Sequence, residues 1–317
     1  MELDQWLGIE VRHLAALNAV AEEGTFRAAA TRLGYTQSAV SQQIATLERL
    51  VGAKLVERPG GPRAVSLTET GRLVLRHAEA IIARLKAAQA DVAALVEGGA
   101  GTLRVGAFQS VGARILPELL LRFRSAWPAV EVQLKESASD SELLDLVRRG
   151  DLDLAFAMPP LPDGPFGHVE LMRDSWVLLV PSGSALASQA EPVTLREVAA
   201  LPLIGARLCR SAEQVHAHFR ARGLEPRYVF HSDENNTVHG LVAAGSGIAL
   251  IPRLAVDEND DRVTPIALGS KVPRRVIAVA WHRDRYRPPA AEAFVELARE
   301  LCRELEARTD GTIAAVA

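Results

Sequence analysis

The sequence predicts an α/β protein with a separate, helix-rich N-terminal domain, and three observations carry this prediction. Residues 11–96 show apolar residues mostly at helical spacing, whereas strand and helix patterns alternate after Gly101. Between them, residues 97–101 read Glu-Gly-Gly-Ala-Gly, the composition of a hinge. The chain has 317 residues, 48% hydrophobic and 24% charged, which is ordinary for a soluble globular protein of two or three domains.

The charge of the chain is unevenly distributed. The formal net charge of −3 does not by itself indicate a nucleic-acid-binding protein. Residues 24–67, however, hold six basic side chains against only two acidic ones. A local basic patch in a mildly acidic chain favours a DNA-binding module joined to a domain of another kind.

The first elements are three short helices. Residues 11–23 form an opening amphipathic helix. Thr25 is placed to cap the next helix with its hydroxyl, Gly34 to end that helix, and Thr36 to cap the third. The tight spacing of the second and third helices predicts a helix-turn-helix; an ordinary helical hairpin is the alternative.

The third helix has two distinct faces. One face is apolar, with Val40, Ile44, Leu47 and Val51 at spacings of four, three and four residues. The other shows short uncharged polar side chains, namely Gln37, Ser38, Ser41 and Gln42. Such amide and hydroxyl groups can read base edges when a helix enters the major groove of DNA.

A β-hairpin follows the helix pair. Residues 54–58 and 63–67 have strand composition, and the Pro-Gly-Gly-Pro sequence between them is a turn. This hairpin is typical of a wing. Arg58 and Arg63 are placed to contact phosphates or the minor groove, with a solvated basic turn as the alternative.

A long helix is predicted from Thr68, its expected cap, to about Val96. Seven apolar residues repeat along it with alternating gaps of four and three: Val74, Ala78, Ile81, Leu85, Ala88, Val92 and Leu95. Three heptads with so narrow a seam need a partner helix, which predicts dimerisation. Burial of the seam within the same chain is the alternative.

The remainder of the chain predicts two α/β lobes with largely parallel sheets. After a strand at 102–108, one helix is expected to run through Phe123, and strands and helices then alternate to a closing helix at 290–307. Crossovers are expected near Asp174 and Val272. The predicted domains are 1–67 (DNA-binding), 68–100 (linker helix and hinge) and 101–310 (lobe I at 101–174 and 272–310, lobe II at 175–271).

Several classes of protein are excluded by what the sequence lacks. It has no signal-peptide pattern, no apolar run long enough for a membrane span, and only two cysteines, so we expect a cytoplasmic protein without disulfides or membrane contact. No spacing supports a metal site, a cofactor or a catalytic constellation, so an enzyme is not expected.

With these parts in order, the chain resembles the LysR-type transcriptional regulators over nearly its whole length. The resemblance is strongest at residues 19–58, continues through Leu-Thr-Glu-Thr-Gly at 67–71, and returns at 240–256. It implies a winged helix-turn-helix, a linker helix and a two-lobed effector domain like that of periplasmic binding proteins. It also implies a homodimer or homotetramer that bends double-stranded promoter DNA and communicates with RNA polymerase.

By the same resemblance, Gln37, Ser38, Ser41 and Gln42 fall at DNA-contacting positions and Arg63 at a wing contact. We add Thr25, Thr36 and Arg58 as candidate DNA-binding residues. Many members have Pro at the position of Ser38 and Arg at that of Gln42. Gln42 can still make a bidentate contact to adenine, whereas Arg would favour guanine.

Candidate effector contacts follow the strands of both lobes, where ligands of two-lobed folds bind. They are Ser110, Ser137, Arg207, Cys209, Arg210, Ser211 and Asp233, which match effector-lining segments in the resemblance. Two arginines beside hydroxyl groups suggest a small carboxylate or other anionic effector. For each residue, a helix cap or surface loop is the alternative.

The main alternative function is a solute-binding protein of the two-lobed α/β type. It accounts for the lobes but not for residues 1–97, and it would need an export signal. Cys209 lies near the reactive cysteine of peroxide-sensing relatives, but the partner position nine residues on holds His218, which argues against a disulfide switch.

Overall fold

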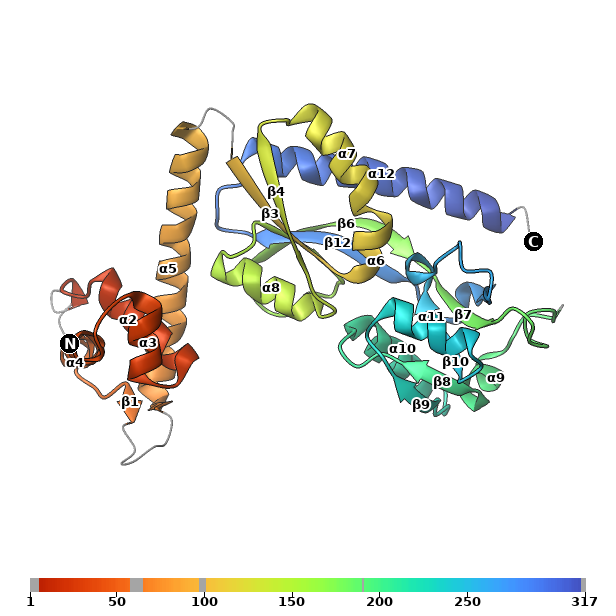
Figure 1. Ribbon diagram of the computed structural model, residues 1–317, viewed down its shortest axis with the longest axis horizontal. Coiled ribbons are helices and arrows are strands. Elements are labelled where there is room, and N and C mark those ends of the chain that lie inside the picture. Colours follow the sequence, from red (N-terminus) through yellow and green to blue (C-terminus); the bar gives the residue numbers. More distant parts are fainter. Residues whose placement is uncertain (1–5, 58–64, 97–100, 190, 315–317) are drawn as a thin grey trace. The chain divides into compact units, whose positions relative to one another are not determined.

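The computed structural model describes residues 6–57, 65–96, 101–189 and 191–314. The chain divides into two compact units, Met1–Val92 and Ala93–Ala317, which are treated separately below. Figure 1 shows the helical N-terminal unit in red and orange and the two-lobed unit in yellow to blue.

The N-terminal unit is a three-helix core followed by a small hairpin and one long helix. The helices are α2 (Val11–Glu23), α3 (Phe26–Leu33) and α4 (Gln37–Val51). Strands β1 (Val56–Glu57) and β2 (Ser66–Leu67) pair antiparallel, and α5 (Glu69–Val96) follows. The turn between the strands, with Arg58 and Arg63, lies outside the described residues.

The predicted helix caps are present. The Thr25 hydroxyl accepts the Ala28 N–H at 3.2 Å, and the Thr36 hydroxyl accepts the Ala39 N–H at the same distance. Gly34 ends α3 with a φ of 70°, a left-handed conformation that costs glycine little. The helix-turn-helix predicted from these residues is confirmed.

The apolar face of α4 packs as the spacing predicts. Val40, Ile44 and Leu47 are completely buried against residues of α2 and α3. The polar face therefore points away from the core, which fixes the orientation of the candidate base-reading side chains.

The start of α5 is attached to the segment before β1 at several points. Thr68 donates its hydroxyl to the Lys54 carbonyl at 2.7 Å and its N–H to the Leu55 carbonyl at 3.0 Å. The same hydroxyl accepts the Gly71 N–H at 2.9 Å and so caps the helix. A Cβ on Gly71 would lie 2.0 Å from the Leu55 carbonyl oxygen, so only glycine allows this approach. The Leu-Thr-Glu-Thr-Gly segment is thus a joint between hairpin and helix.

The seam of α5 divides into two parts. Val74 and Ala78 are buried in the core of the N-terminal unit, so the prediction that the whole seam faces a partner helix was wrong for these two. Beyond them, Ile81, Leu85 and Val92 are 49%, 54% and 59% exposed. The side chain of Leu95 lies outside the described residues.

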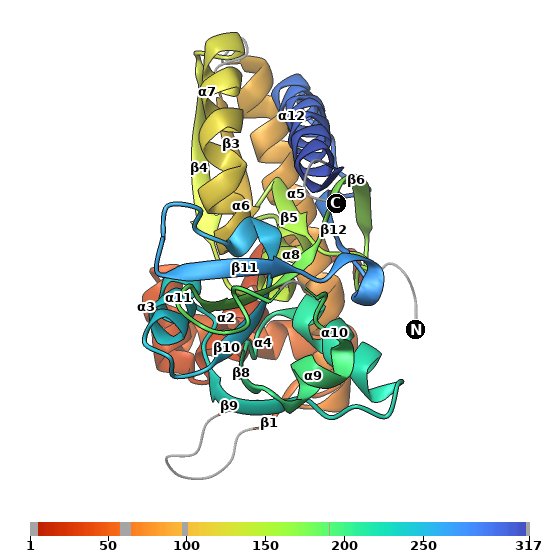
Figure 2. The ribbon, with the colours of Figure 1, turned by 90° about the vertical axis from the view of Figure 1, so that its right-hand side faces the viewer.

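Lobe I is built on a five-stranded sheet of order β4-β3-β5-β12-β6. Its strands are β3 (Gly101–Ala107), β4 (Val130–Glu136), β5 (Leu154–Ala157), β6 (Phe166–Asp174) and β12 (Arg275–His282). On one face α6 (Gln109–Arg114), α7 (Leu116–Ala126) and α12 (Pro289–Ala314) cover the sheet, and α8 (Asp140–Arg149) covers the other. Figures 1 and 2 both show α7 and α12 side by side.

Lobe II has a second five-stranded sheet, of order β11-β7-β10-β8-β9. The strands are β7 (Trp176–Pro181), β8 (Pro202–Gly205), β9 (Arg227–His231), β10 (Ile248–Pro252) and β11 (Val263–Ala267). Helices α9 (Leu195–Ala200) and α10 (Arg210–Arg220) pack on one face, and α11 (Asn235–Ala243) packs on the other. Two short 3-10 turns, η1 (Arg253–Ala255) and η2 (Gly269–Lys271), lie between lobe II strands and before β12.

Several details of this fold differ from the prediction, and strand β6 was not expected at all. Each sheet has parallel and antiparallel neighbours in equal number, so the expectation of largely parallel sheets was wrong. The single helix expected through Phe123 is two helices that meet at Ile115. Pro117 in the first turn of α7 explains the break, because proline has no N–H to donate and its ring clashes with the preceding turn.

Within the described ranges, no helix is long and apolar enough to cross a membrane. Both cysteines are free thiols. Burial raises the pKa of the Cys302 thiol to about 12, so this residue behaves as a small apolar side chain.

Candidate DNA interface and effector cavity

The candidate DNA-reading face of α4 is accessible. Gln37, Ser38 and Gln42 are exposed, and Ser41 is half-buried. The Ser38 hydroxyl lies 3.0 Å from that of Thr36. Because Thr25 and Thr36 use their hydroxyls as helix caps, their first role is to fix where α3 and α4 begin, which orients this face.

The basic patch of this unit is partly neutralised. Arg32 pairs with Glu22, and it also lies 3.5 Å from Glu23. Lys54 pairs with Glu48 at 2.9 Å. The electrostatic attraction to DNA is therefore weaker than the six basic residues of the sequence imply.

Glu48 joins the end of α4 to the start of the hairpin. Its buried carboxylate accepts the N–H groups of Leu55 at 2.9 Å and Val56 at 3.4 Å, besides the Lys54 ammonium. Burial alone would raise the pKa of this carboxyl, but the Leu55 N–H and the other donors outweigh burial and lower it. The carboxylate thus holds the hairpin in a fixed position relative to α4.

Replacing Glu48 with alanine is expected to lower the free energy of unfolding of the N-terminal unit by about 2–4 kcal/mol, because two buried N–H donors lose their acceptor. Since the pKa of Glu48 is lower in the folded state, its stabilising contribution is complete above the ordinary pKa of about 4.5 and is lost as the pH falls below it. Hydrogen exchange of the Leu55 and Val56 amides measures both effects.

Glu48→Gln is the matched control, because glutamine keeps the acceptor oxygen and loses only the charge. We expect it to cost roughly 1 kcal/mol and to remove the acid sensitivity of these two amides. Equal acid sensitivity in both proteins would show that another group is responsible.

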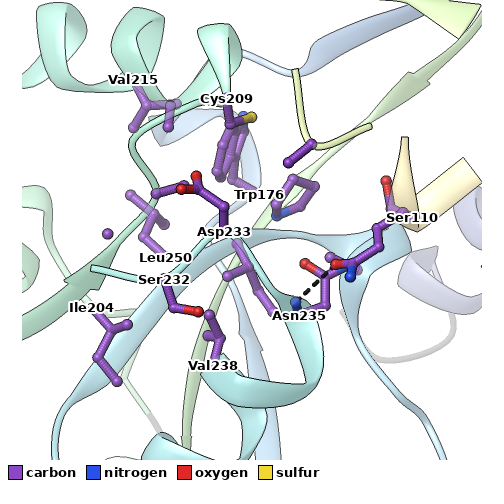
Figure 3. Close-up of a pocket in the computed structure, with 18 of the residues that line it drawn as sticks. Ser110, Trp176, Ile204, Cys209, Val215, Ser232, Asp233, Asn235, Val238 and Leu250 are labelled. Atoms are coloured by element: carbon purple, nitrogen blue, oxygen red, sulfur yellow. Dashed lines mark hydrogen bonds between the residues drawn. The ribbon is translucent and has the colours of Figure 1, made fainter. Parts of the chain in front are cut away.

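The second candidate site is a cavity of about 100 Å³ between the two lobes. Lobe I contributes Phe108, Gln109, Ser110, Ala138 and Arg275, and lobe II contributes the larger share. Most of the lobe II lining is apolar or aromatic, including Trp176, Ile204, Val215, Tyr228, Val238 and Leu250. In Figure 3, Ser110 approaches from the side opposite Cys209 and Asp233.

Three of the seven sequence-predicted effector residues line this cavity: Ser110, Cys209 and Asp233. Ser110 is buried, and its hydroxyl accepts a hydrogen bond from Arg275 Nη2 at 2.8 Å. Asp233 Oδ1 accepts the N–H groups of Arg207 and Leu208, both at 2.8 Å. At the start of α6, the Val111 and Gly112 N–H groups both donate to the Phe108 carbonyl, each at 3.0 Å.

The other four predicted residues, Ser137, Arg207, Arg210 and Ser211, do not line the cavity. Ser137 donates to Glu142, Ser211 is buried with its hydroxyl 3.0 Å from Cys209 Sγ, and the Arg207 side chain is exposed.

Arg210 instead crosses from lobe II to lobe I. Its Nε donates to the buried carboxylate of Asp140 at 3.0 Å, and its Nη2 donates to the Met158 carbonyl. The two arginines behind the expectation of an anionic effector are therefore not cavity residues.

The lobes are also connected on the other side of the cavity. Gln109, at the start of α6, accepts the Asn235 N–H at 2.9 Å and donates to Glu234. The hydrogen bond from the Asn235 N–H to Gln109 is the dashed line in Figure 3. Together with Arg210 and Asp140, it holds the cleft in its present closure.

A buried ion pair lies where the chain passes between the lobes. Asp174 ends β6 and Arg275 begins β12, and the two are directly opposite in the ladder. Their side chains are 3% and 4% exposed, and Arg275 Nη2 lies 2.7 Å from Asp174 Oδ2. Asp174 also accepts the Leu254 N–H of lobe II at 3.2 Å, and the Arg275 guanidinium lies 5.4 Å from the centre of the Phe108 ring. One network thus joins the crossover strands to the cavity.

Sequence analysis missed most of the apolar cavity wall and also Arg275. Trp176 and Tyr228 lie inside strands β7 and β9, where the sequence alone does not distinguish an aromatic residue of a binding site from one of the core. Burial raises the pKa of the Tyr228 phenol, so it stays protonated. Among the residues that the structure describes, no group of three or more His, Cys, Asp or Glu could hold a metal ion.

Comparison with known proteins gives the same division of the chain. The profile of the "Bacterial regulatory helix-turn-helix protein, lysR family" matches residues 11–72, and that of the "LysR substrate binding domain" matches residues 97–303. An uncharacterised HTH-type transcriptional regulator, YybE of Bacillus subtilis, is 31% identical over 84% of this chain and 90% of its own. The SDS degradation transcriptional activation protein of a Pseudomonas strain is 32% identical over 95% of this chain and 96% of its own.

Solved structures agree on the fold. CbnR, a LysR family transcriptional regulator, superposes with a TM-score of 0.63 at 23% identity, covering 92% of this chain and 99% of that one. Full-length CbnR complexed with its target DNA superposes with a TM-score of 0.56 at 24% identity and the same coverage. The two-lobed α/β effector domain predicted from the sequence is confirmed.

Proposed function

Because this chain belongs to the LysR family of DNA-binding transcriptional regulators, we propose that α4 is its recognition helix and that it reads its operator through Gln37, Ser38, Ser41 and Gln42. The observation that carries this proposal is the exposed, uncharged polar face of α4, whose other side is fully buried. Amide and hydroxyl side chains form hydrogen bonds with base edges, and Gln favours adenine. Thr25 and Thr36 set the position of the helix, and Arg58 and Arg63 are proposed as phosphate contacts.

A gel-shift experiment with the intergenic DNA beside the gene tests this function. The protein is expected to retard that DNA, with an affinity that falls steeply as the salt concentration rises, because phosphate contacts release counterions. If no fragment of the neighbouring intergenic DNA is retarded at low salt, the proposal is wrong.

Ser41→Ala tests the assignment of the reading face. Loss of one hydrogen bond to DNA is expected to weaken operator affinity by about 5- to 30-fold without changing the melting temperature of the free protein. Thr46→Ala removes a hydroxyl from the same helix outside the candidate face and serves as the control. Unchanged operator affinity of Ser41→Ala would remove Ser41 from the reading face.

The α/β unit is proposed to bind a small-molecule effector in the cavity between its lobes. Contacts on both sides of the cavity, Arg210 with Asp140 and Gln109 with Asn235, cross from one lobe to the other. A ligand that binds one degree of closure more tightly than another shifts the population of closed domains. In a homodimer or homotetramer, this shift would change how the recognition helices contact promoter DNA. It would also change how the assembly meets RNA polymerase.

A further inference from the structure

The polarity of the cavity indicates what class of effector fits it, if the proposed effector function holds. Among the described residues that line it, Arg275 carries the positive charge. Its guanidinium is already committed, since Nε donates to Asp174 Oδ2 at 2.8 Å and Nη2 donates to Ser110 at 2.8 Å. The positive charge of Arg275 is therefore balanced by Asp174 and does not favour a ligand carboxylate.

Asp233 supplies the remaining charge of the lining. Both backbone N–H groups that it accepts, from Arg207 and Leu208, end on Oδ1. Among the described residues, no lysine or arginine side chain pairs with this carboxylate. Oδ2 thus remains an acceptor for a donor group of a ligand. Because Asp174, behind the lining, balances Arg275, the charge of Asp233 is the one left unbalanced at the cavity.

The rest of the cavity sets the size and shape of the ligand. Trp176, Tyr228, Ile204, Val238 and Leu250 give it an apolar wall. At about 100 Å³ the cavity is well below the roughly 300–1,000 Å³ of pockets that hold drug-sized ligands. It therefore fits a molecule with about one small ring or one branched aliphatic group.

We propose that the effector is a compact apolar molecule with a hydrogen-bond donor, best an amine, which binds Asp233, and that carboxylates are disfavoured. An ammonium group beside Asp233 forms a charge-assisted hydrogen bond in a largely apolar site. A carboxylate in the same place meets a like charge, and no unpaired lysine or arginine is among the described residues that line the cavity, so its burial is unfavourable. We therefore expect a cationic or hydrogen-bond-donating effector and not the anionic effector that the sequence suggested.

Three probes of nearly equal size test the proposal on the full chain: benzylamine, benzyl alcohol and benzoate. Isothermal titration at millimolar probe and constant ionic strength measures binding, and thermal shift of the same samples provides a second readout. We expect benzylamine to bind most tightly, benzyl alcohol less tightly, and benzoate at least about tenfold more weakly than benzylamine.

Two variants connect the result to this site. Asp233→Asn keeps an oxygen for the two backbone N–H groups, so it should fold normally, lose the preference for benzylamine and keep benzyl alcohol binding. Ala212→Leu adds volume to the cavity wall and should weaken all three probes. Asp163→Asn removes an exposed carboxylate elsewhere and should change none of them.

Any of four results would overturn the proposed effector class. Benzoate could bind as tightly as benzylamine, or all three probes could fail to bind. Asp233→Asn could keep the preference for benzylamine, or Ala212→Leu could leave binding unchanged. A gel shift of the same preparation separates this from the function. If operator binding persists while the probe results fail, the ligand class is wrong and the DNA-binding function stands; if operator binding is absent, the function itself fails.

Discussion

Replacing Asp174 with alanine is expected to lower the free energy of unfolding of the α/β unit by about 3–5 kcal/mol, because the Arg275 guanidinium then remains buried without a counter-charge. The Leu254 N–H of lobe II also loses its acceptor in this variant. Urea unfolding followed by tryptophan fluorescence measures the change, since Trp176 is two residues away on β7.

The double variant Asp174→Leu/Arg275→Met separates the cost of an unpaired charge from the worth of the pair. It removes both charges and leaves apolar side chains of similar volume, so it should recover most of the lost stability. Glu304→Gln, at the exposed bidentate pair with Arg122, should cost much less stability than Asp174→Ala, because water screens an exposed pair. Near-wild-type stability of the two single variants, Asp174→Ala and Arg275→Met, would mean that the pair is hydrated and not buried in solution.

We propose that the subunits associate through α5, and replacing Ile81 and Leu85 together with aspartate is then expected to convert the assembly to monomers. These two side chains are about half exposed in the single chain. They continue the helical seam beyond Val74 and Ala78, which are buried in the core of the N-terminal unit. In a paired helix they would be buried, where four introduced carboxylates per dimer would be desolvated close to one another. Light scattering measures the mass, and gel shift should show a parallel loss of operator affinity.

Leu73→Asp is the matched control for the seam, because Leu73 is an equally exposed leucine of α5 that lies outside the heptad positions. It should leave the mass unchanged. A dimer that persists in the Ile81→Asp/Leu85→Asp protein would show that α5 is not the dimer contact.

The N-terminal unit could be predicted almost completely from the sequence, because local chemistry determines it. Caps such as Thr25 and Thr36 and the left-handed Gly34 act within one helical turn of their own position. The seam was only partly predictable, since heptad spacing marks an apolar face but not which partner covers each residue. Val74 and Ala78 are covered by the helix-turn-helix of the same chain.

The effector cavity was harder to predict, because its polarity depends on contacts between residues far apart in the chain. Strand β6 was missed because its apolar positions do not alternate regularly. Arg210 was expected at the ligand, but it pairs with Asp140, which is 70 residues earlier. Arg275 lies 165 residues from Ser110, and no local pattern indicates their contact.

The attachment of α5 at Leu55 makes the helix a lever arm. With 28 residues and 1.5 Å of rise per residue, α5 is about 42 Å long. Glu48, Thr68 and Gly71 hold its first turn against the hairpin and the end of α4, so helix and recognition face turn as one body. If α5 tilts by about 10° about its C-terminal end, its N-terminal end moves sideways by about 7 Å. This is roughly two base-pair steps of 3.4 Å. Small rotations distant from the DNA are therefore large enough to shift a recognition helix out of register with its half-site.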